Sequence, residues 1–291
     1  MSVQIKFLAN YCMSNYKKIM NPHKQNIPAV LSIAGSDPSG GAGIQADLKT
    51  FMAAGVYGAA VITALTAQNT IGVQGSMAVP ADFVEQQLTS VLSDIPINAI
   101  KLGMLPNSEI CEKIAGHLSG RPVVCDPVMV STSGHRLIDY AAIEALFTKI
   151  LPVSDYITPN RAELEILYGS VPPEAKQAGR KLLERFPGLK GILIKGGHGP
   201  KTSGKTTDTF VFRQDDKVIS TSETHPHIDT RNTHGTGCTF SSAFASYIAK
   251  KHTPAQAFEK AVQLTAALIE LSADHGIGDG HGPLLHHIFA H

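Results

Sequence analysis

From residue 27 onward, short apolar runs alternate with longer amphipathic stretches. The apolar runs have the length and composition of buried strands, at 29–34, 59–65, 99–104, 122–129, 156–158 and 191–194. The stretches between them carry apolar residues at helical spacing, at 44–54, 82–92, 108–118, 141–150, 162–168 and 174–186. Continuous apolar strands separated by helices are typical of a parallel sheet that is covered on both faces. The pattern therefore predicts an α/β fold.

The alternation changes in the last third of the chain. Two runs rich in β-branched and aromatic residues, 209–212 and 218–221, flank a polar turn at 214–217. This arrangement predicts an antiparallel hairpin at the edge of the sheet. Two long helices, 239–250 and 254–273, are expected after the hairpin because apolar residues recur there at helical spacing.

The chain has 291 residues and shows no internal repeat, low-complexity tract or linker after residue 26. We therefore interpret residues 27–291 as a single domain, which is long enough to bury a substantial core. Residues 1–26 are polar with scattered apolar positions, and they lack the continuous apolar segment of a signal peptide. We interpret them as a poorly ordered extension.

Composition argues against several classes of protein. The 25 basic and 24 acidic side chains nearly cancel, whereas a general nucleic-acid binder would show a basic excess. No apolar run reaches the roughly 18 residues needed to cross a bilayer, so no membrane partner is expected. No two of the four cysteines form a C-x-x-C pair. A structural zinc site and a disulfide framework are therefore not expected, and a cytoplasmic location fits.

The most informative local motif is N-T-H-G-T-G-C at residues 232–238, directly before a predicted helix. Its two glycines allow a tight turn and a close approach of the backbone to a ligand. The helix start adds unpaired N–H groups and the positive end of the helix dipole, which together suit a phosphate. A glycine-rich helix entry without a ligand is the alternative interpretation.

A second glycine-rich turn, at residues 35–43, also leads from a predicted strand into a predicted helix. Loops at the carboxyl ends of parallel strands are where α/β proteins bind ligands, although a tight turn alone would explain the glycines. Residues 199–206 match the phosphate-loop pattern G-x-x-x-x-G-K-T. A true phosphate loop opens a helix, and a hairpin strand is expected here, so we interpret this segment as a surface loop.

Polar residues that follow predicted strands are candidates for binding phosphate or metal. Glu163 lies in the first turn of a helix that begins after Asn160, where a carboxylate can hold magnesium or its waters. Asp126 follows a strand at the same carboxyl edge, and Lys195 ends another strand and can meet a phosphate as a point charge. The alternatives are a helix cap with a solvated Glu163 and a turn residue at Asp126.

Taken in order, several motifs resemble those of the ribokinase-like superfamily. They resemble more closely the bacterial hydroxymethylpyrimidine/phosphomethylpyrimidine kinases of thiamine biosynthesis. The matching segments are residues 34–47, 63–70, 101–104, 126–129, 157–160, 195–198 and 232–238. The resemblance implies a ribokinase-like three-layer sandwich, in which helices flank a central, mainly parallel sheet, and it implies a homodimer.

The resemblance also implies an activity, namely two successive phosphorylations by ATP with Mg²⁺. The first acts on 4-amino-5-hydroxymethyl-2-methylpyrimidine, a small-molecule substrate, and the second acts on its monophosphate. It implies that Cys238 stands where many relatives have an aspartate base, and that Gly235 and Gly237 form the anion hole. The other roles that it implies are substrate binding for Gln68, Gly35, Asp47, Thr66, Met104 and Val128, nucleotide binding for Lys195, Asn160 and Thr236, and metal binding for Glu163 and Asp126.

Other functions stay open at this point. A pyridoxal kinase would share the fold, and Gln68 discriminates against it because an amide can pair with an aminopyrimidine edge as donor and acceptor. A non-catalytic pyrimidine-binding protein would not need Cys238, Glu163 and the glycine motif together. Because Cys238 precedes a helix, we also expect the helix N-terminus to lower its pKa and favour the thiolate.

Overall fold

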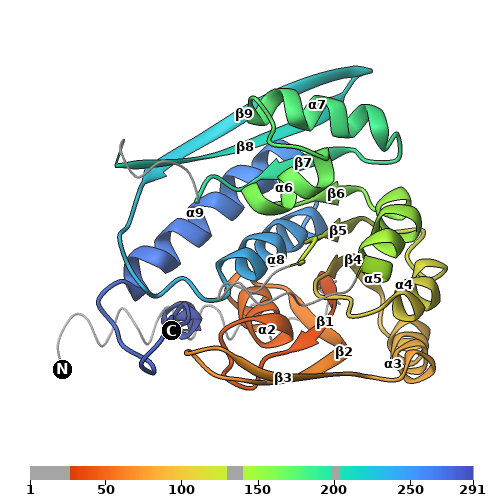
Figure 1. Cartoon of the computed structure of the whole chain (residues 1–291), viewed down its shortest axis with the longest axis horizontal. Helices are drawn as coiled ribbons and strands as arrows, with labels where there is room; N and C mark the ends of the chain where they lie inside the picture. Colours follow the sequence, from red (N-terminus) through yellow and green to blue (C-terminus); the bar gives the residue numbers. More distant parts are fainter. Residues whose placement is uncertain (1–26, 130–139, 198–203, 291) are drawn as a thin grey trace, which may run out of the picture.

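The computed structural model describes residues 27–129, 140–197 and 204–290, so the N-terminal segment expected to be poorly ordered lies outside the described residues. Within these ranges the strands form one mixed sheet in the order β3-β2-β1-β4-β5-β6-β7-β8-β9 (Figure 1). The strands are β1 (Ala29–Ser36), β2 (Tyr57–Gln68), β3 (Val73–Ala78), β4 (Ile97–Leu102), β5 (Val123–Cys125), β6 (Tyr156–Ile157), β7 (Gly191–Ile194), β8 (Lys205–Gln214) and β9 (Lys217–Pro226). The strands from β2 to β7 in this order are parallel, whereas β3, β8 and β9 are antiparallel to their neighbours.

Helices cover both faces of the sheet (Figure 1). One layer holds α2 (Gly43–Ala53), α8 (Thr236–Ala249) and α9 (Pro254–Ser272). The other layer holds α3 (Ala81–Asp94), α4 (Ser108–Ala115), α5 (Tyr140–Ala145), α6 (Arg161–Tyr168) and α7 (Ala175–Arg185). The predicted three-layer α/β sandwich is therefore confirmed. None of the helices in the described ranges has the length and apolar character needed to cross a membrane.

Alternate side chains of the strands enter two separate cores. Leu31 of β1 belongs to the core that includes Leu88 of α3, whereas its neighbour Val30 belongs to the core that includes Phe51 of α2 and Phe244 of α8. Successive side chains of a strand point to opposite faces, so a strand that is buried on both faces must be apolar at nearly every position. The continuous apolar runs predicted the two helical layers for this reason.

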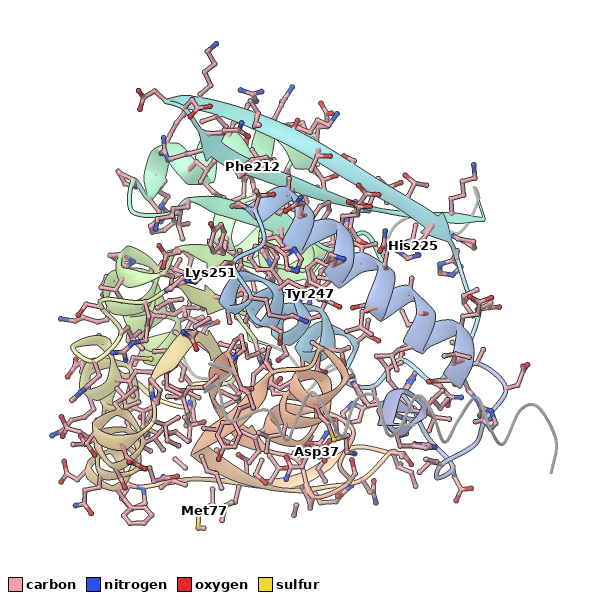
Figure 2. The ribbon with its side chains drawn as sticks, turned by 180° about the vertical axis from the view of Figure 1, so that it is seen from behind. Asp37, Met77, Phe212, His225, Tyr247 and Lys251 are labelled. Carbon is pink, nitrogen blue, oxygen red and sulfur yellow. The ribbon has the colours of Figure 1, made fainter. Side chains whose placement is uncertain are left out.

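The predicted hairpin is present as β8 and β9, and Figure 2 shows it from the side opposite to that of Figure 1. Asp215 and Asp216 join the two strands, and both have a positive φ, 48° and 60°, which is the backbone of a tight type I′ turn. Residues 198–203 lie outside the described residues, so most of the segment that matches a phosphate loop does too. Lys205 and Thr206, at its end, begin β8, so a strand rather than a helix follows this segment.

The sheet differs from the expectation at two places. β3 was not predicted, because most of its six residues are exposed and it carries few β-branched or aromatic side chains. It pairs antiparallel with β2, for example through Leu65 and Met77, so both edges of the sheet are antiparallel rather than only the hairpin edge. β5 is shorter than the predicted 122–129, because Pro127, which has no N–H to donate to a neighbouring strand, soon follows it.

Candidate active site

A cavity of about 690 Å³ lies at the carboxyl ends of the parallel strands, between the sheet and the start of α8. It brings together the residues predicted for the site with one exception, and these are Gly35, Thr66, Gln68, Met104, Asp126, Val128, Asn160, Glu163, Lys195, Gly235, Thr236, Gly237 and Cys238. Parallel strands end at the same edge of a sheet, so loops that are far apart in the sequence converge there. The topology therefore explains why the candidates meet.

Asp47, which was predicted to bind substrate, is the exception. It is completely buried on α2, and both of its carboxylate oxygens accept hydrogen bonds from Lys101 Nζ at 2.9 Å. The hydroxyls of Ser32 and Ser242 also donate to it, at 2.5 Å and 2.7 Å. Because buried groups occupy its acceptor positions, Asp47 holds Lys101 in place beneath the cavity. Asp47 was predicted to contact the substrate, and it is absent from the described residues that line the cavity.

The two glycine-rich turns meet at the start of α8. Gly235 caps this helix with a φ of 82°, and a Cβ atom built on it would lie 1.8 Å from the carbonyl oxygen of Gly41. Only glycine can adopt this left-handed conformation at such a close contact without strain. The contact fixes the first turn of α8 against the cavity, where its N–H groups favour an anion. The Lys195 ammonium adds a positive charge, since a Cβ on Gly237 would lie 3.2 Å from its Nζ.

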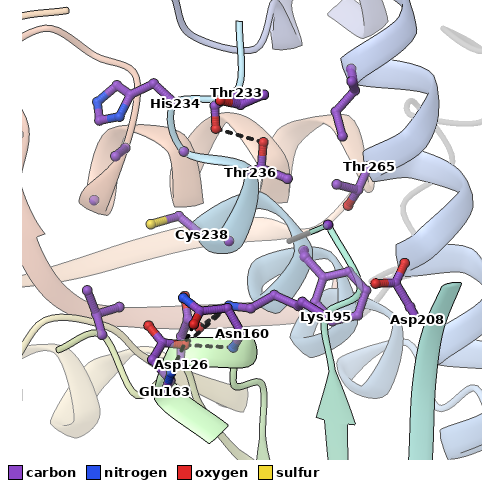
Figure 3. Close-up of a pocket in the computed structure, with 18 of the residues that line it drawn as sticks. Asp126, Asn160, Glu163, Lys195, Asp208, Thr233, His234, Thr236, Cys238 and Thr265 are labelled. Atoms are coloured by element: carbon purple, nitrogen blue, oxygen red, sulfur yellow. Dashed lines mark hydrogen bonds and ion pairs between the residues drawn. The ribbon is translucent and has the colours of Figure 1, made fainter. Parts of the chain in front are cut away.

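Lys195 also contacts two buried carboxylates (Figure 3). Its Nζ lies 2.8 Å from Asp126 Oδ1 and 3.9 Å from Glu163 Oε2. Glu163 closes a capping box, because its Oε2 accepts from Asn160 N at 2.8 Å while Asn160 Oδ1 accepts from Glu163 N at 2.9 Å. Burial raises the pKa of Glu163 to about 7, and the charge of Lys195 only partly opposes this effect. The helix cap considered as an alternative is thus present, but Glu163 is buried rather than solvated.

The Cys238 thiol lies in the first turn of α8 and is partly exposed to the cavity. Burial raises the pKa of the thiol to about 11, and the negative charges of Asp47 and Asp126 act in the same direction. They outweigh the Lys101 ammonium and a hydrogen bond from the backbone N–H of Gly43, both of which lower the pKa. The expectation that a helix N-terminus gives Cys238 a low pKa is therefore wrong.

Gln68 has partners at its end of the cavity that sequence reasoning missed. His234 Nε2 lies 2.8 Å from Asp37 Oδ2 and 3.2 Å from the terminal amide of Gln68. Met104 and Val128 contribute apolar side chains to the wall of the same cavity. Asp37 and His234 each lie in a glycine-rich turn that the sequence singled out, but the contact between the two turns has no signal in a single sequence.

The other end of the cavity was also missed. One face of α9, with Val262, Thr265, Ala266 and Ile269 at helical spacing, forms an apolar wall. Beside it, Asp208 of β8 accepts a hydrogen bond from Gly196 N at 2.7 Å, and its Oδ2 lies 3.1 Å from His225 Nε2. Figure 3 shows Thr265 and Asp208 on one side of the cavity and His234 and Cys238 on the other. The sequence predicted α9 from its apolar spacing, but it gave no role to this face of the helix.

Comparisons with known proteins agree with this geometry. The model of the family described as phosphomethylpyrimidine kinase matches residues 37–285. A hydroxymethylpyrimidine/phosphomethylpyrimidine kinase of Haemophilus influenzae is 41% identical over 268 residues, which cover 90% of this chain and 97% of the relative. A thiamine biosynthesis multifunctional protein of Corynebacterium efficiens is 42% identical over 264 residues, and this chain spans only 35% of its length.

Solved structures show the same fold. A phosphomethylpyrimidine kinase of Clostridium difficile has 37% identity and a TM-score of 0.70, covering 84% of this chain and 99% of that one. An ADP complex of a Bacillus subtilis pyridoxal kinase has 32% identity and a TM-score of 0.77, covering 90% of this chain and 98% of that one. The sheet order, the flanking helices and the glycine-rich start of α8 define a ribokinase-like kinase. Within this class, the chain belongs to the phosphomethylpyrimidine kinase family.

Proposed function

We propose that this chain transfers the terminal phosphoryl group of ATP to the hydroxymethyl group of 4-amino-5-hydroxymethyl-2-methylpyrimidine, and then a second group to the resulting monophosphate. One observation carries the proposal. A single cavity is lined by the Gln68 amide, the Cys238 thiol and the N-terminus of α8. These supply a partner for an aminopyrimidine edge, a proton acceptor and a phosphate site, which are the parts that phosphoryl transfer to such an alcohol needs.

Each residue has a role that follows from its place. The first-turn N–H groups at Gly235 and Gly237 stabilise the charge of the transferring phosphoryl group, and Lys195 adds a point charge. Cys238, once deprotonated, accepts the hydroxyl proton of the substrate. We assign the apolar face of α9 around Thr265 to the adenine ring, because a flat apolar ring needs such a wall and the face lies across the cavity from Cys238.

The residues of the cavity suit a magnesium ion whose coordination shell is completed by phosphate oxygens. Asp126 and Glu163 are buried carboxylates that both contact one ammonium group, so their oxygens converge on a common space. In the described ranges no group of three or more His, Cys, Asp and Glu side chains is placed to hold a metal ion. Magnesium accepts one or two carboxylates when waters and phosphate oxygens complete its shell. Asp126 and Glu163 would hold the ion, which would neutralise phosphate charge.

Pyridoxal phosphorylation is a second candidate function. Several solved structures with this fold, at 30–32% identity, are pyridoxal kinases, including one from Staphylococcus aureus in complex with AMP-PCP and pyridoxal. An apolar wall with a few polar groups would accept either ring. The Gln68 amide favours the aminopyrimidine, because it can donate to a ring nitrogen and accept from the adjacent amino group.

Product analysis tests the proposal. The full chain is incubated with ATP, Mg²⁺ and equal concentrations of hydroxymethylpyrimidine and pyridoxal, and the products are resolved by phosphorus NMR. We expect pyrimidine monophosphate first and pyrimidine diphosphate later, with pyridoxal phosphate a minor product. Pyridoxal phosphate as the main product, or no phosphorylated pyrimidine, would refute it. The homodimer and the cytoplasmic location stay predictions, and analytical ultracentrifugation tests the first.

A further inference from the structure

Three side chains from three separate segments are linked at the Gln68 end of the cavity. Asp37 lies in the turn after β1, His234 lies just before α8, and Gln68 is the last residue of β2. His234 Nε2 is 2.8 Å from Asp37 Oδ2 and 3.2 Å from the terminal nitrogen position of Gln68. One imidazole nitrogen, Nε2, therefore faces two partners. Whether Nε2 carries a hydrogen decides whether each partner atom must accept or donate a hydrogen bond.

Asp37 determines that Nε2 of His234 carries a hydrogen. Its Oδ1 accepts from Ser39 N at 2.9 Å and from Ser39 Oγ at 2.7 Å, and its Oδ2 accepts from Ala42 N at 2.8 Å. Burial raises the pKa of Asp37, but the hydrogen bonds from His234 and Ser39 outweigh burial and lower it to about 2. An ionised carboxylate only accepts, so His234 Nε2 must carry a hydrogen whether or not the ring is charged.

The same hydrogen determines the direction of the Gln68 amide. An amide nitrogen 3.2 Å from an Nε2–H would place two donors against each other. The two ends of an amide have nearly the same shape, so the hydrogen-bond network decides which atom lies where. The network requires Oε1 of Gln68 at this position, where it accepts from His234. The amide nitrogen then lies at the 3.3 Å position beside Thr66 Oγ1.

Thr66 completes the network in a consistent way. Its hydroxyl donates to Ser36 O at 3.0 Å, so its oxygen is free to accept from the Gln68 amide nitrogen. With these bonds made, Gln68 has one N–H and one lone pair of Oε1 left for a ligand. Thr66 thereby holds the nitrogen end of the Gln68 amide, while His234 holds its oxygen end.

We infer that Asp37 and His234 are positioning residues that lock the Gln68 amide in one direction and so make it select a ring edge with an acceptor beside an amino donor. This inference rests on the proposed function and deepens it. A 4-aminopyrimidine presents such an edge through its ring nitrogen and exocyclic amine. The corresponding 4-oxo compound presents the reverse order, a carbonyl acceptor beside a ring N–H. Its ring N–H would face the N–H of Gln68, and its carbonyl oxygen would face Oε1 of Gln68, so neither hydrogen bond could form.

The packing of His234 supports a positioning role. Its ring fills the space over Gly41, where an added Cβ would lie 2.3 Å from its Cδ2. Its backbone N–H donates to Gly282 O at 3.0 Å, and the C-terminal segment at Pro283 pairs with it as an isolated bridge. A ring held on several sides keeps its Nε2–H in a fixed direction, as a group that orients another must do.

The test compares the amino and 4-oxo forms of hydroxymethylpyrimidine as substrates and, in calorimetry without ATP, as ligands. We expect the natural chain to prefer the amino form by roughly 10⁴-fold or more in kcat/KM, because the wrong edge leaves buried polar groups unpaired. In His234→Ala the amide is free to turn, so the preference should fall at least about tenfold, with a gain on the 4-oxo form. His234→Gln keeps a donor and should restore the preference.

His286→Ala is the matched control, because it also removes a buried imidazole but from a site beside Thr239 rather than Gln68. Its preference should equal that of the natural chain. An equal loss on both substrates in His234→Ala, with the preference unchanged, would overturn the inference. So would nitrogen NMR of the natural chain that shows His234 with the hydrogen on Nδ1 alone. Preferential binding of the amino form without turnover would instead refute only the kinase proposal.

Discussion

Cys238 should matter far more for the first phosphorylation than for the second. In the first reaction the acceptor is an alcohol, whose proton must leave as the new bond forms. In the second reaction the acceptor is a phosphate oxygen, and a phosphate monoester, with its second pKa near 6, is already largely deprotonated at pH 8. Cys238→Ala keeps the backbone N–H of the anion site and removes only the thiol. We therefore expect kcat for the alcohol to fall about a hundredfold, and kcat for the monophosphate to change little.

The magnitude of the pH dependence follows from the pKa of the thiol. Burial raises the pKa of Cys238 to about 11, so only about one molecule in a thousand carries the thiolate at pH 8. The thiolate fraction grows about tenfold for each pH unit below that pKa. The kcat/KM for the alcohol should therefore rise with a slope near one from pH 7 to about pH 10. Cys238→Asp supplies a base that is ionised throughout this range, so its profile should be flat.

The assay is initial-rate kinetics with each acceptor separately, in buffers of constant ionic strength. Alkylation by iodoacetamide gives an independent reading, because the thiolate is the reactive form, and the rate at pH 8 should be roughly a hundredfold below that of a free cysteine thiol. A flat wild-type profile between pH 7 and 9 would refute the assignment of a high-pKa thiol as the base. So would an equal loss of both phosphorylations in Cys238→Ala.

Three further predictions test other parts of the site. Lys101→Met leaves the Asp47 carboxylate buried without its cation and should lower the free energy of unfolding by about 3–5 kcal/mol in urea titrations. Adding Asp47→Asn should recover much of the loss, and no recovery would show that the ion pair is not the cause. Gln68→Met should raise the pyrimidine KM, since the lost partners are worth about 1–3 kcal/mol, while nucleotide affinity in a separate titration stays within error. Gly235→Ala should lower kcat and the melting temperature together, because its Cβ would overlap Gly41 O, whereas retained activity would mean that the two turns can separate.

Most of the fold could be predicted because burial on both faces of the sheet leaves a strong pattern. β7 matches the predicted strand at both ends, and β1 and α9 match within a few residues, since each is apolar at the positions that face a core. β3 could not be predicted, because its residues are exposed and its stability comes from pairing with β2, which is a long-range contact. Local sequence carries no record of such a partner.

The candidate site was predicted where a residue sits in a local motif and missed where two segments must meet. The glycine-rich start of α8 is visible in the sequence, since turn and helix entry are both local features. The pairing of Asp47 with Lys101 is not, because the two residues are far apart along the chain and only the burial of both shows that they are partners. The pKa of Cys238 was misjudged for the same reason, because it is raised by burial and by the charges of Asp47 and Asp126, which lie far from Cys238 along the chain.

The start of α8 unites functions that are separate in many sites. In the function that we propose, three parts of residues 234–238 act together: the side chain of His234 orients Gln68, the glycine backbone forms the phosphate site, and the side chain of Cys238 accepts the proton. The C-terminal segment braces this unit at two points, through Gly282 O on the backbone of His234 and through His286, whose Nε2 lies 2.9 Å from Thr239 Oγ1. The start of α8 thus positions the substrate ring, the transferring phosphoryl group and the base. A displacement of this helix end should therefore misalign all three. Mutations in the C-terminal brace, including His286→Ala, should therefore lower kcat for the amino and 4-oxo substrates in equal proportion, because they leave the contacts of His234 with Asp37 and Gln68 in place.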